Sequence, residues 1–260
     1  MYTTVQLEKP FNPLLGETFQ SYFLDGTRVY CEMISHHPPI GNFLMEDPEE
    51  LYTFYGHYEF KAKVTSNALN LRTDGPNHLV FPDGQHITFI VPNKKVGGML
   101  WGDRTVVHDE SYTIEDRKNG WKCVVLHDTK RHDVVHGKIY KYKPELNLQR
   151  KEPQKLSEIK DIQQEICDVS GSYLERVVIG DKEYWHIDKV RPMKPIPVAN
   201  PLPSDPRFRD DLIWMFRGHQ EYASIWKSHL ENQQRHERKL RAECDKAHGR
   251  EPAFQYHHHH

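Results

Sequence analysis

The chain has 260 residues, of which 37% are hydrophobic and 28% are charged, and its formal net charge is −2. Its 13 Tyr, 11 Phe and 5 Trp argue against a disordered chain, and the balanced charge argues against a nucleic-acid partner, since duplex-DNA binders are usually basic. No apolar run approaches the roughly 18 residues of a membrane span, and the N-terminus lacks the basic and apolar regions of a signal peptide.

Residues 1–190 are predicted to be rich in β-strands. Residues 51–64 are aromatic-rich and roughly alternating, and similar runs lie at residues 29–34, 86–91, 111–114, 121–126, 134–142, 173–179 and 183–187. Turn pairs such as Asp25-Gly26 and Asn119-Gly120 separate these runs at about 8–12 residues, which is typical of an antiparallel sandwich or barrel. Residues 151–167 are polar and are predicted to be helix or loop. Trp101-Gly102 is expected to contribute a turn and core packing.

The chain after residue 190 changes character twice. Residues 191–206 hold six prolines, so they can be neither a helix interior nor a central strand, and a stiff connector is predicted. A short helix is predicted over residues 207–217, with Ser204 or Asp205 as N-cap, Pro206 in its first turn and Gly218 at its end. Residues 220–248 contain many helix-forming residues and no Pro, and they predict a long helix whose later turns are mostly charged.

The cysteines and histidines predict neither disulfides nor a metal centre. The four cysteines have no CxxC spacing, which favours reduced cytosolic thiols. His257–His260 resemble the remnant of a purification tag and are set aside. His127, His132 and His136 are loosely spaced and are expected to lie in loops. No cofactor is expected.

Two segments combine prolines with groups that bind anions. Residues 9–17 read Lys-Pro-Phe-Asn-Pro-Leu-Leu-Gly-Glu, whose two prolines hold Lys9 beside a rigid, extended backbone. Residues 35–39 read Ser-His-His-Pro-Pro and follow a predicted strand. Adjacent histidines on a regular strand point to opposite faces, but the prolines permit one shared pocket. A metal would need further ligands at HxH or HxxxH spacing, so a structural role or phosphate binding by the imidazoles is favoured.

A third set of candidate residues lies on the predicted long helix. Lys227, Glu231 and Arg235 are spaced i, i+4, i+8 and therefore share one helix face. Composition alone favours a solvated face on which Glu231 bridges two cations.

These segments together resemble the oxysterol-binding protein-related family. Residues 32–39, Glu-Met-Ile-Ser-His-His-Pro-Pro, are similar to the family fingerprint Glu-Gln-Val-Ser-His-His-Pro-Pro and depart from it at Met33 and Ile34. Residues 9–17 resemble the family's upstream Lys-Pro-Phe-Asn-Pro segment, and residues 203–211 resemble its Asp-Ser-Arg-(Phe/Leu)-Arg-Pro-Asp segment. The resemblance covers roughly residues 5–240.

The resemblance implies a mainly β fold with α: a large antiparallel, nearly closed β-barrel that encloses a lipid tunnel, with C-terminal helices. Residues 1–190 would form the lipid-binding core and residues 191–206 the connector. Residues 207–256 would pack on the barrel within the same domain, and 257–260 would be the tag remnant. In the family a lid helix precedes the Lys-Pro-Phe-Asn-Pro segment, whereas eight residues precede it here, so the usual lid is expected to be missing.

The resemblance also implies function. The module would bind phosphatidylinositol 4-phosphate and exchange it for a second lipid, sterol or phosphatidylserine, as a cytoplasmic protein peripheral to membranes. The residues carried over by motif are Lys9, His36, His37, Lys227 and Arg235 on the inositol phosphates, Asn12 on the glycerol-phosphate region, and Glu231 orienting the two flanking cations. The 4-phosphate and the phosphodiester of this lipid carry about three negative charges near neutral pH, and they would face three fixed cations and two imidazoles.

Two alternatives belong to other classes of protein. A histidine-dependent hydrolase would use His36 and His37, but no two-metal carboxylate spacing and no GxSxG motif is present, so an enzyme is not expected. A scaffold would use the charged helix to bind protein partners and leave the barrel empty.

Overall fold

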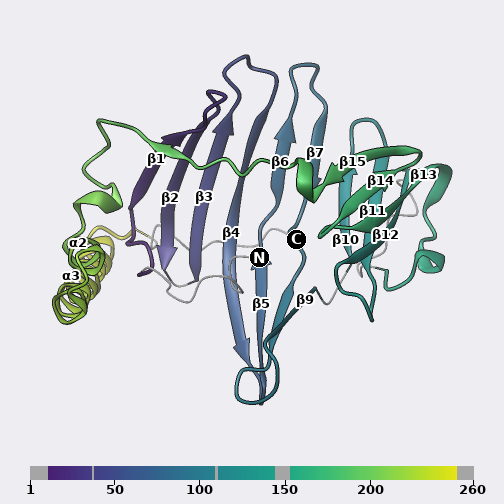
Figure 1. The fold of residues 1–260 in the computed structure, drawn as a ribbon. Coiled ribbons are helices and arrows are strands. Elements are labelled where there is room, and N and C mark those ends of the chain that lie inside the picture. Colours follow the sequence, from purple (N-terminus) through teal and green to yellow (C-terminus); the bar gives the residue numbers. More distant parts are fainter. Residues whose placement is uncertain (1–10, 37, 109–110, 144–152, 251–260) are drawn as a thin grey trace.

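The computed structural model describes residues 11–36, 38–108, 111–143 and 153–250 (Figure 1). Sixteen strands form one antiparallel sheet in these residues. The strands are β1 (Thr18–Tyr22), β2 (Arg28–His36), β3 (Pro39–Glu46), β4 (Thr53–Val64), β5 (Ala68–Asp74), β6 (Asn77–Val80), β7 (His86–Phe89), β8 (Lys94–Gly97), β9 (Thr105–His108), β10 (Tyr112–Asp116), β11 (Trp121–His127), β12 (Val134–Tyr142), β13 (Ile162–Ser172), β14 (Arg176–Ile179), β15 (Lys182–His186) and β16 (Ile196–Pro197). The predicted antiparallel β class is therefore confirmed.

The sheet is large and curved but is not closed by hydrogen bonds. Its main path runs β15-β14-β13-β12-β11-β10-β7-β6-β4-β3-β2-β1-β16, and within the described chain β15 and β16 do not pair. The proline-rich segment crosses in front of the sheet from β15 toward β1, where Tyr22 is paired with Ile196 (Figure 1). A strand that contains proline is tolerated there because it lies at the sheet edge.

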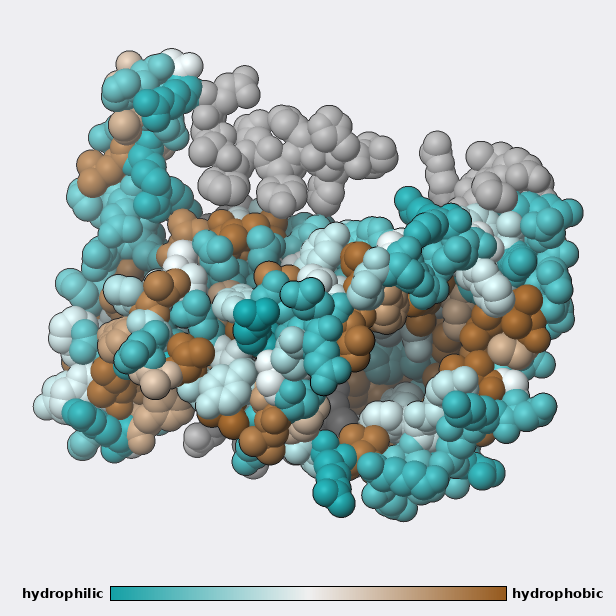
Figure 2. Space-filling view, turned by 90° about the horizontal axis from the view of Figure 1, so that it is seen from above, coloured by the Kyte–Doolittle hydropathy of each residue, from teal (hydrophilic) through white to brown (hydrophobic). Residues whose placement is uncertain are grey.

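Apolar side chains lie on both faces of the sheet. On one face the rings of Phe43 and Phe54 are 5.1 Å apart, and those of Phe54 and Phe89 are 6.1 Å apart. On the opposite face, Val124, Tyr140 and Tyr142 pack with Ile159 from the segment before β13. Seen from above, the molecule is hollowed, and hydrophobic atoms line part of the hollow (Figure 2).

The helices follow the connector and lie beside β1 and β2 (Figure 1). They are the α-helices α2 (Asp210–Phe216) and α3 (Gln220–Ala247), preceded by the 3-10 turn η4 (Pro206–Phe208). Two further 3-10 turns, η2 (Leu156–Glu158) and η3 (Ile187–Lys189), lie before the connector. The Asp205 side chain caps η4 by accepting a hydrogen bond from the amide of Arg207. Gly218 follows α2 with a φ of 81°, which glycine adopts without steric cost. No helix in the described part of the chain is long and apolar enough to cross a membrane.

The prediction for residues 151–167 is wrong in one respect, because a strand replaces the expected helix or loop. β13 begins at Ile162 and pairs with β12 along its length, with two register shifts. Its first half is mostly exposed and polar, so it lacks the apolar alternation that marks a strand in sequence. Its place is fixed by backbone hydrogen bonds to β12, which local sequence does not reveal.

Candidate functional site

A pocket of about 1030 Å³ lies between the chain that leads into β1, the end of β2 and one face of α3. Phe11 and Asn12 line it from the first segment, Ser35 and His36 from the second, and Lys227 from the helix. Segments from the start, the middle and the end of the sequence therefore meet at one place. Lys9 and His37, the other two residues predicted for this site, lie outside the described residues.

The three predicted helix residues form a linked row along the wall of the pocket. Glu231 Oε1 lies 2.9 Å from Lys227 Nζ, and Glu231 Oε2 lies 3.4 Å from Arg235 Nη2. The hydrogen bond from Lys227 holds the pKa of the Glu231 carboxyl below its ordinary value. The Lys227 ammonium also lies 5.7 Å from the ring centre of Phe11. Glu231 thus contacts both cations and limits where each can point.

His36 faces the same helix one turn further along. Its Nε2 lies 3.0 Å from Oε1 of Gln234, a residue 198 positions away in sequence. An amide oxygen at this distance accepts a hydrogen bond from the ring N–H, so Gln234 fixes the orientation of the imidazole. Proline follows the described end of β2 at position 38, and β3 begins at Pro39, so the turn leaves His36 at the edge of the sheet.

Arg209 lines the pocket and joins two of the segments that form it. Its guanidinium donates to both carboxylate oxygens of Asp211, at 3.0 and 2.6 Å, to Glu17 at 2.7 Å and to the backbone carbonyl of Asn12 at 2.9 Å. The Arg209 and Asp211 side chains are buried. This network joins the start of α2 to the segment before β1 and thereby holds Asn12 beside the helix.

A match to a protein-family model identifies the family of this chain. The family model for oxysterol-binding protein matches residues 1–179, which is more than half of the chain. The chain belongs to the oxysterol-binding protein family. It is 29% identical over 258 residues to Oxysterol-binding protein 9 of Dictyostelium discoideum, covering 92% of this chain and 58% of that protein. It is 25% identical to Oxysterol-binding protein-related protein 3C of Arabidopsis thaliana, covering 90% of this chain and 54% of that protein.

Solved structures share the fold of this family member. The Osh3 ORD of Saccharomyces cerevisiae in complex with PI(4)P matches with a TM-score of 0.70 and 21% identity, over 90% of this chain and 64% of that one. The Osh1 ORD domain in complex with cholesterol matches with a TM-score of 0.71 and 24% identity, over 92% and 63%. The chain thus spans a little over half the length of these two curated relatives and less than two thirds of these solved domains.

Sequence reasoning missed several residues of the pocket in this family member. Gln234, Arg238 and Arg241 line it, and so does Arg209, which also holds the Asn12 carbonyl in place. The helical spacing of 227, 231, 234/235, 238 and 241 gives a signal, because it continues the stripe that the predicted triplet begins. The contacts of Arg209 had no such local signal. In the described residues no group of three His, Cys, Asp or Glu is placed to hold a metal ion.

A second histidine pair lies away from the pocket, at the end of β9 and β11. The rings of His108 and His127 are stacked with centres 4.6 Å apart, and each also meets the ring of Tyr173. Lys94 is the register partner of His108. Burial lowers the pKa of His108 to about 4 and also lowers that of His127, because a protonated ring would lose its hydration.

This stacked pair predicts that stability falls on acidification. Between the ordinary histidine pKa of about 6.5 and the folded pKa of about 4, the unfolded chain binds more protons than the folded chain. The free energy of unfolding should therefore decrease as the pH falls through this window, by at most about 1.4 kcal/mol per pH unit for each proton. Urea unfolding across this range should show a shallower slope for His108→Phe, whereas His136→Phe, an exposed control on β12, should keep the native slope. An unchanged slope in His108→Phe would contradict the assignment.

Proposed function

We propose that this chain binds phosphatidylinositol 4-phosphate by its headgroup at the pocket between β2 and α3. The inositol phosphates are gripped by Lys9, His36, His37, Lys227 and Arg235, and Asn12 contacts the glycerol-phosphate region. Glu231 orients the two cations that flank it. The observation that supports the proposal is the convergence of Asn12, His36 and the α3 triplet on one pocket.

The electrostatics of the pocket wall support an anionic ligand. On α3 the lining residues include Lys227, Arg235, Arg238 and Arg241 against Glu231 and Asp245, an excess of two positive charges, four minus two. Lys227 and Arg235 keep 41% and 58% of their side-chain surface exposed, so they remain accessible to a ligand. Guanidinium groups bind phosphate bidentately, which adds geometric selectivity to the charge.

The proposal extends to lipid exchange rather than catalysis. The solved domain of one relative is in complex with PI(4)P, and that of another is in complex with cholesterol or ergosterol. We infer that this chain exchanges phosphatidylinositol 4-phosphate for a sterol or for phosphatidylserine at membrane surfaces, as a peripheral, cytoplasmic, non-enzymatic module. The hydrophobic lining of the hollow in Figure 2 supports a place for acyl chains. Residues 1–190 and 207–256, joined by 191–206, would act as one unit, and the Arg209 contacts to Asn12 and Glu17 support this.

The test is extraction of fluorescent phosphatidylinositol 4-phosphate from liposomes. The double variant Lys227→Ala with Arg235→Ala should lower affinity by about 100-fold or more, since each hydrogen bond to a charged group contributes about 1.5–3 kcal/mol. The matched control is Lys239→Ala with Lys246→Ala, which removes the same charge from exposed positions of α3 outside the pocket. Equal extraction by both double variants would exclude this pocket as the headgroup site.

A further inference from the structure

The loop between β8 and β9 exposes a cluster of large apolar side chains. Leu100, Trp101 and Met99 are 75%, 61% and 37% exposed, and Val64 beside them is 76% exposed. We call residues 64–67 and 98–104 the apolar tip. The expectation that Trp101-Gly102 forms a turn and core packing is half right: the chain turns there, but the indole lies outside the core. Exposing these large apolar side chains together to water is unfavourable. A cluster of this kind marks a surface that contacts another apolar environment.

The tip is held in one conformation by a single side chain. Asn67 Oδ1 accepts hydrogen bonds from the amides of Leu100 at 2.8 Å and Trp101 at 3.1 Å, and its Nδ2 donates to the Trp101 carbonyl at 2.9 Å. The amide of Met99 donates to the Asn67 carbonyl at 3.2 Å. The amides of Met99, Leu100 and Trp101 and the Trp101 carbonyl are thus satisfied within the chain. The loop can leave water without breaking them, and its apolar side chains point outward without a large loss of entropy on binding.

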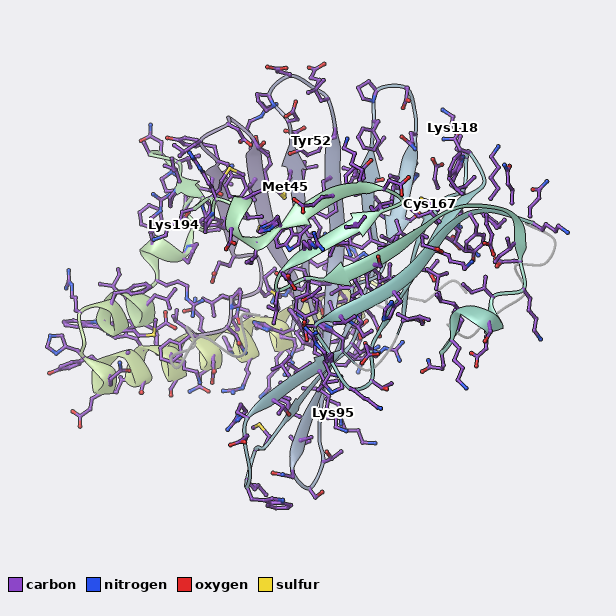
Figure 3. The ribbon with its side chains drawn as sticks, turned by 45° about the vertical axis from the view of Figure 1, so that its right-hand side comes forward. Met45, Tyr52, Lys95, Lys118, Cys167 and Lys194 are labelled. Atoms are coloured by element: carbon purple, nitrogen blue, oxygen red, sulfur yellow. The ribbon has the colours of Figure 1, made fainter. Side chains whose placement is uncertain are left out.

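The tip projects beyond the edge of the sheet that carries His36. The register pairs His36 with Pro39 and Ile40 with Glu59, and β4 then continues to Val64. Strands β5, β8 and β9 build on this extension, which reaches about 17 Å past Glu59 at 3.3 Å per residue. The ribbon that bears Lys95 extends below the rest of the sheet in Figures 1 and 3. The apolar tip and the His36 side of the pocket therefore lie at the same end of the strands.

The charge around the tip differs from that of the whole chain. Residues 62–70 and 94–105 contain Lys63, Lys94, Lys95 and Arg104 against Asp103 alone, an excess of three positive charges, whereas the chain carries −2. A tryptophan with aliphatic neighbours and basic side chains on the adjoining strands is the composition that partitions into the interface of an anionic bilayer. A soluble protein partner would not require this combination at a projecting point.

We propose that the apolar tip inserts into the surface of an anionic lipid bilayer and docks the protein with the pocket facing that membrane. The role of this docking in lipid exchange rests on the proposed function. The binding itself does not, because the tip binds the bilayer whether or not phosphatidylinositol 4-phosphate is present. Trp101 and Leu100 enter the boundary between headgroups and acyl chains. Lys63, Lys95 and Arg104 lie at the level of the phosphates.

The test is co-sedimentation with vesicles of phosphatidylcholine and phosphatidylserine that contain no phosphatidylinositol 4-phosphate. Leu100→Ser with Trp101→Ser should lower vesicle affinity about tenfold or more. Leu24→Ser is the matched control, because Leu24 is 82% exposed in the turn at the opposite edge of the sheet. Binding should weaken with salt and with Lys63→Glu and Lys95→Glu, and brominated lipids should quench tryptophan fluorescence in the native chain but much less in the double variant.

The two proposals fail in different ways. The tip variant should still bind a water-soluble, short-chain phosphatidylinositol 4-phosphate with native affinity. Lys227→Ala with Arg235→Ala should lose that ligand yet keep its binding to the vesicles. Native vesicle affinity in the tip variant, or concentration-dependent self-association that the tip variant abolishes without any vesicle binding in the native chain, would overturn the docking proposal.

Discussion

Replacing Arg209 with methionine should lower the free energy of unfolding by about 3–5 kcal/mol, the range measured when one partner of a buried ion pair is removed. Methionine matches the length of the stem but supplies none of the four hydrogen bonds that Arg209 makes. The Asp211 carboxylate, which is 1% exposed, and the largely buried Glu17 would lose their cation. Urea denaturation followed by far-UV circular dichroism measures the change.

The same substitution should loosen the pocket before the whole protein unfolds. Arg209 is the link between α2 and the carbonyl of Asn12, so its loss should raise hydrogen exchange in residues 11–17 and at the start of α2. Arg209→Lys should be intermediate, because an ammonium keeps the charge but cannot form the fork to Asp211. The exposed pair Arg131–Asp133 supplies the control: Arg131→Met should cost less than about 1 kcal/mol. A loss below that value for Arg209→Met would show that the network is not a structural support.

How well the fold could be predicted from sequence depended on the kind of strand. Strands such as β4 and β11 alternate or carry runs of apolar residues, and their positions were predicted from that pattern. The projecting strands β5 and β8 were not, since β8 has only four residues and begins with two lysines, and the second half of β5 is polar. Whether the sheet closes depends on how sixteen strands curve together, which local pattern does not encode. The long helix α3 followed directly from an uninterrupted stretch of good helix formers.

The residues of the candidate site also differ in how well the sequence predicts them. The Lys227–Glu231–Arg235 row is a local consequence of helical spacing, and the structure places it as the spacing implies. The contact of Gln234 with His36 joins residues 198 positions apart, and that of Arg209 with Glu17 joins residues 192 apart. Contacts of this kind arise from the sheet and connector that bring the chain ends together. Motif resemblance could identify the segments involved, but the supporting side chains emerged only from the three-dimensional arrangement.

The second large effect is expected at Lys122, a buried cation on β11. Its Nζ lies 2.7 Å from Asp161 Oδ2 and 3.3 Å from Glu115 Oε1, and 4.5 Å from the ring centre of Tyr142. Tyr140 donates a hydrogen bond to the other Asp161 oxygen at 3.0 Å. These groups hold the segment before β13 against the sheet. Lys122→Met should therefore cost about 3–5 kcal/mol by leaving the buried Asp161 carboxylate without a cation, whereas Glu115 keeps its contact with Arg117.

A double-mutant cycle separates this pair from ordinary surface electrostatics. Lys122→Met with Asp161→Asn should be less destabilised than the sum of the single variants, with a coupling energy of about 1–3 kcal/mol. The comparison is Lys138–Glu165, which has the same 2.7 Å contact one strand pair away, but whose carboxylate side chain is 58% exposed. Its coupling should stay below about 1 kcal/mol, because water screens it. The two ion pairs have the same N–O distance and differ in burial. Equal coupling energies in the two cycles would refute the view that burial sets the strength of the Lys122 network.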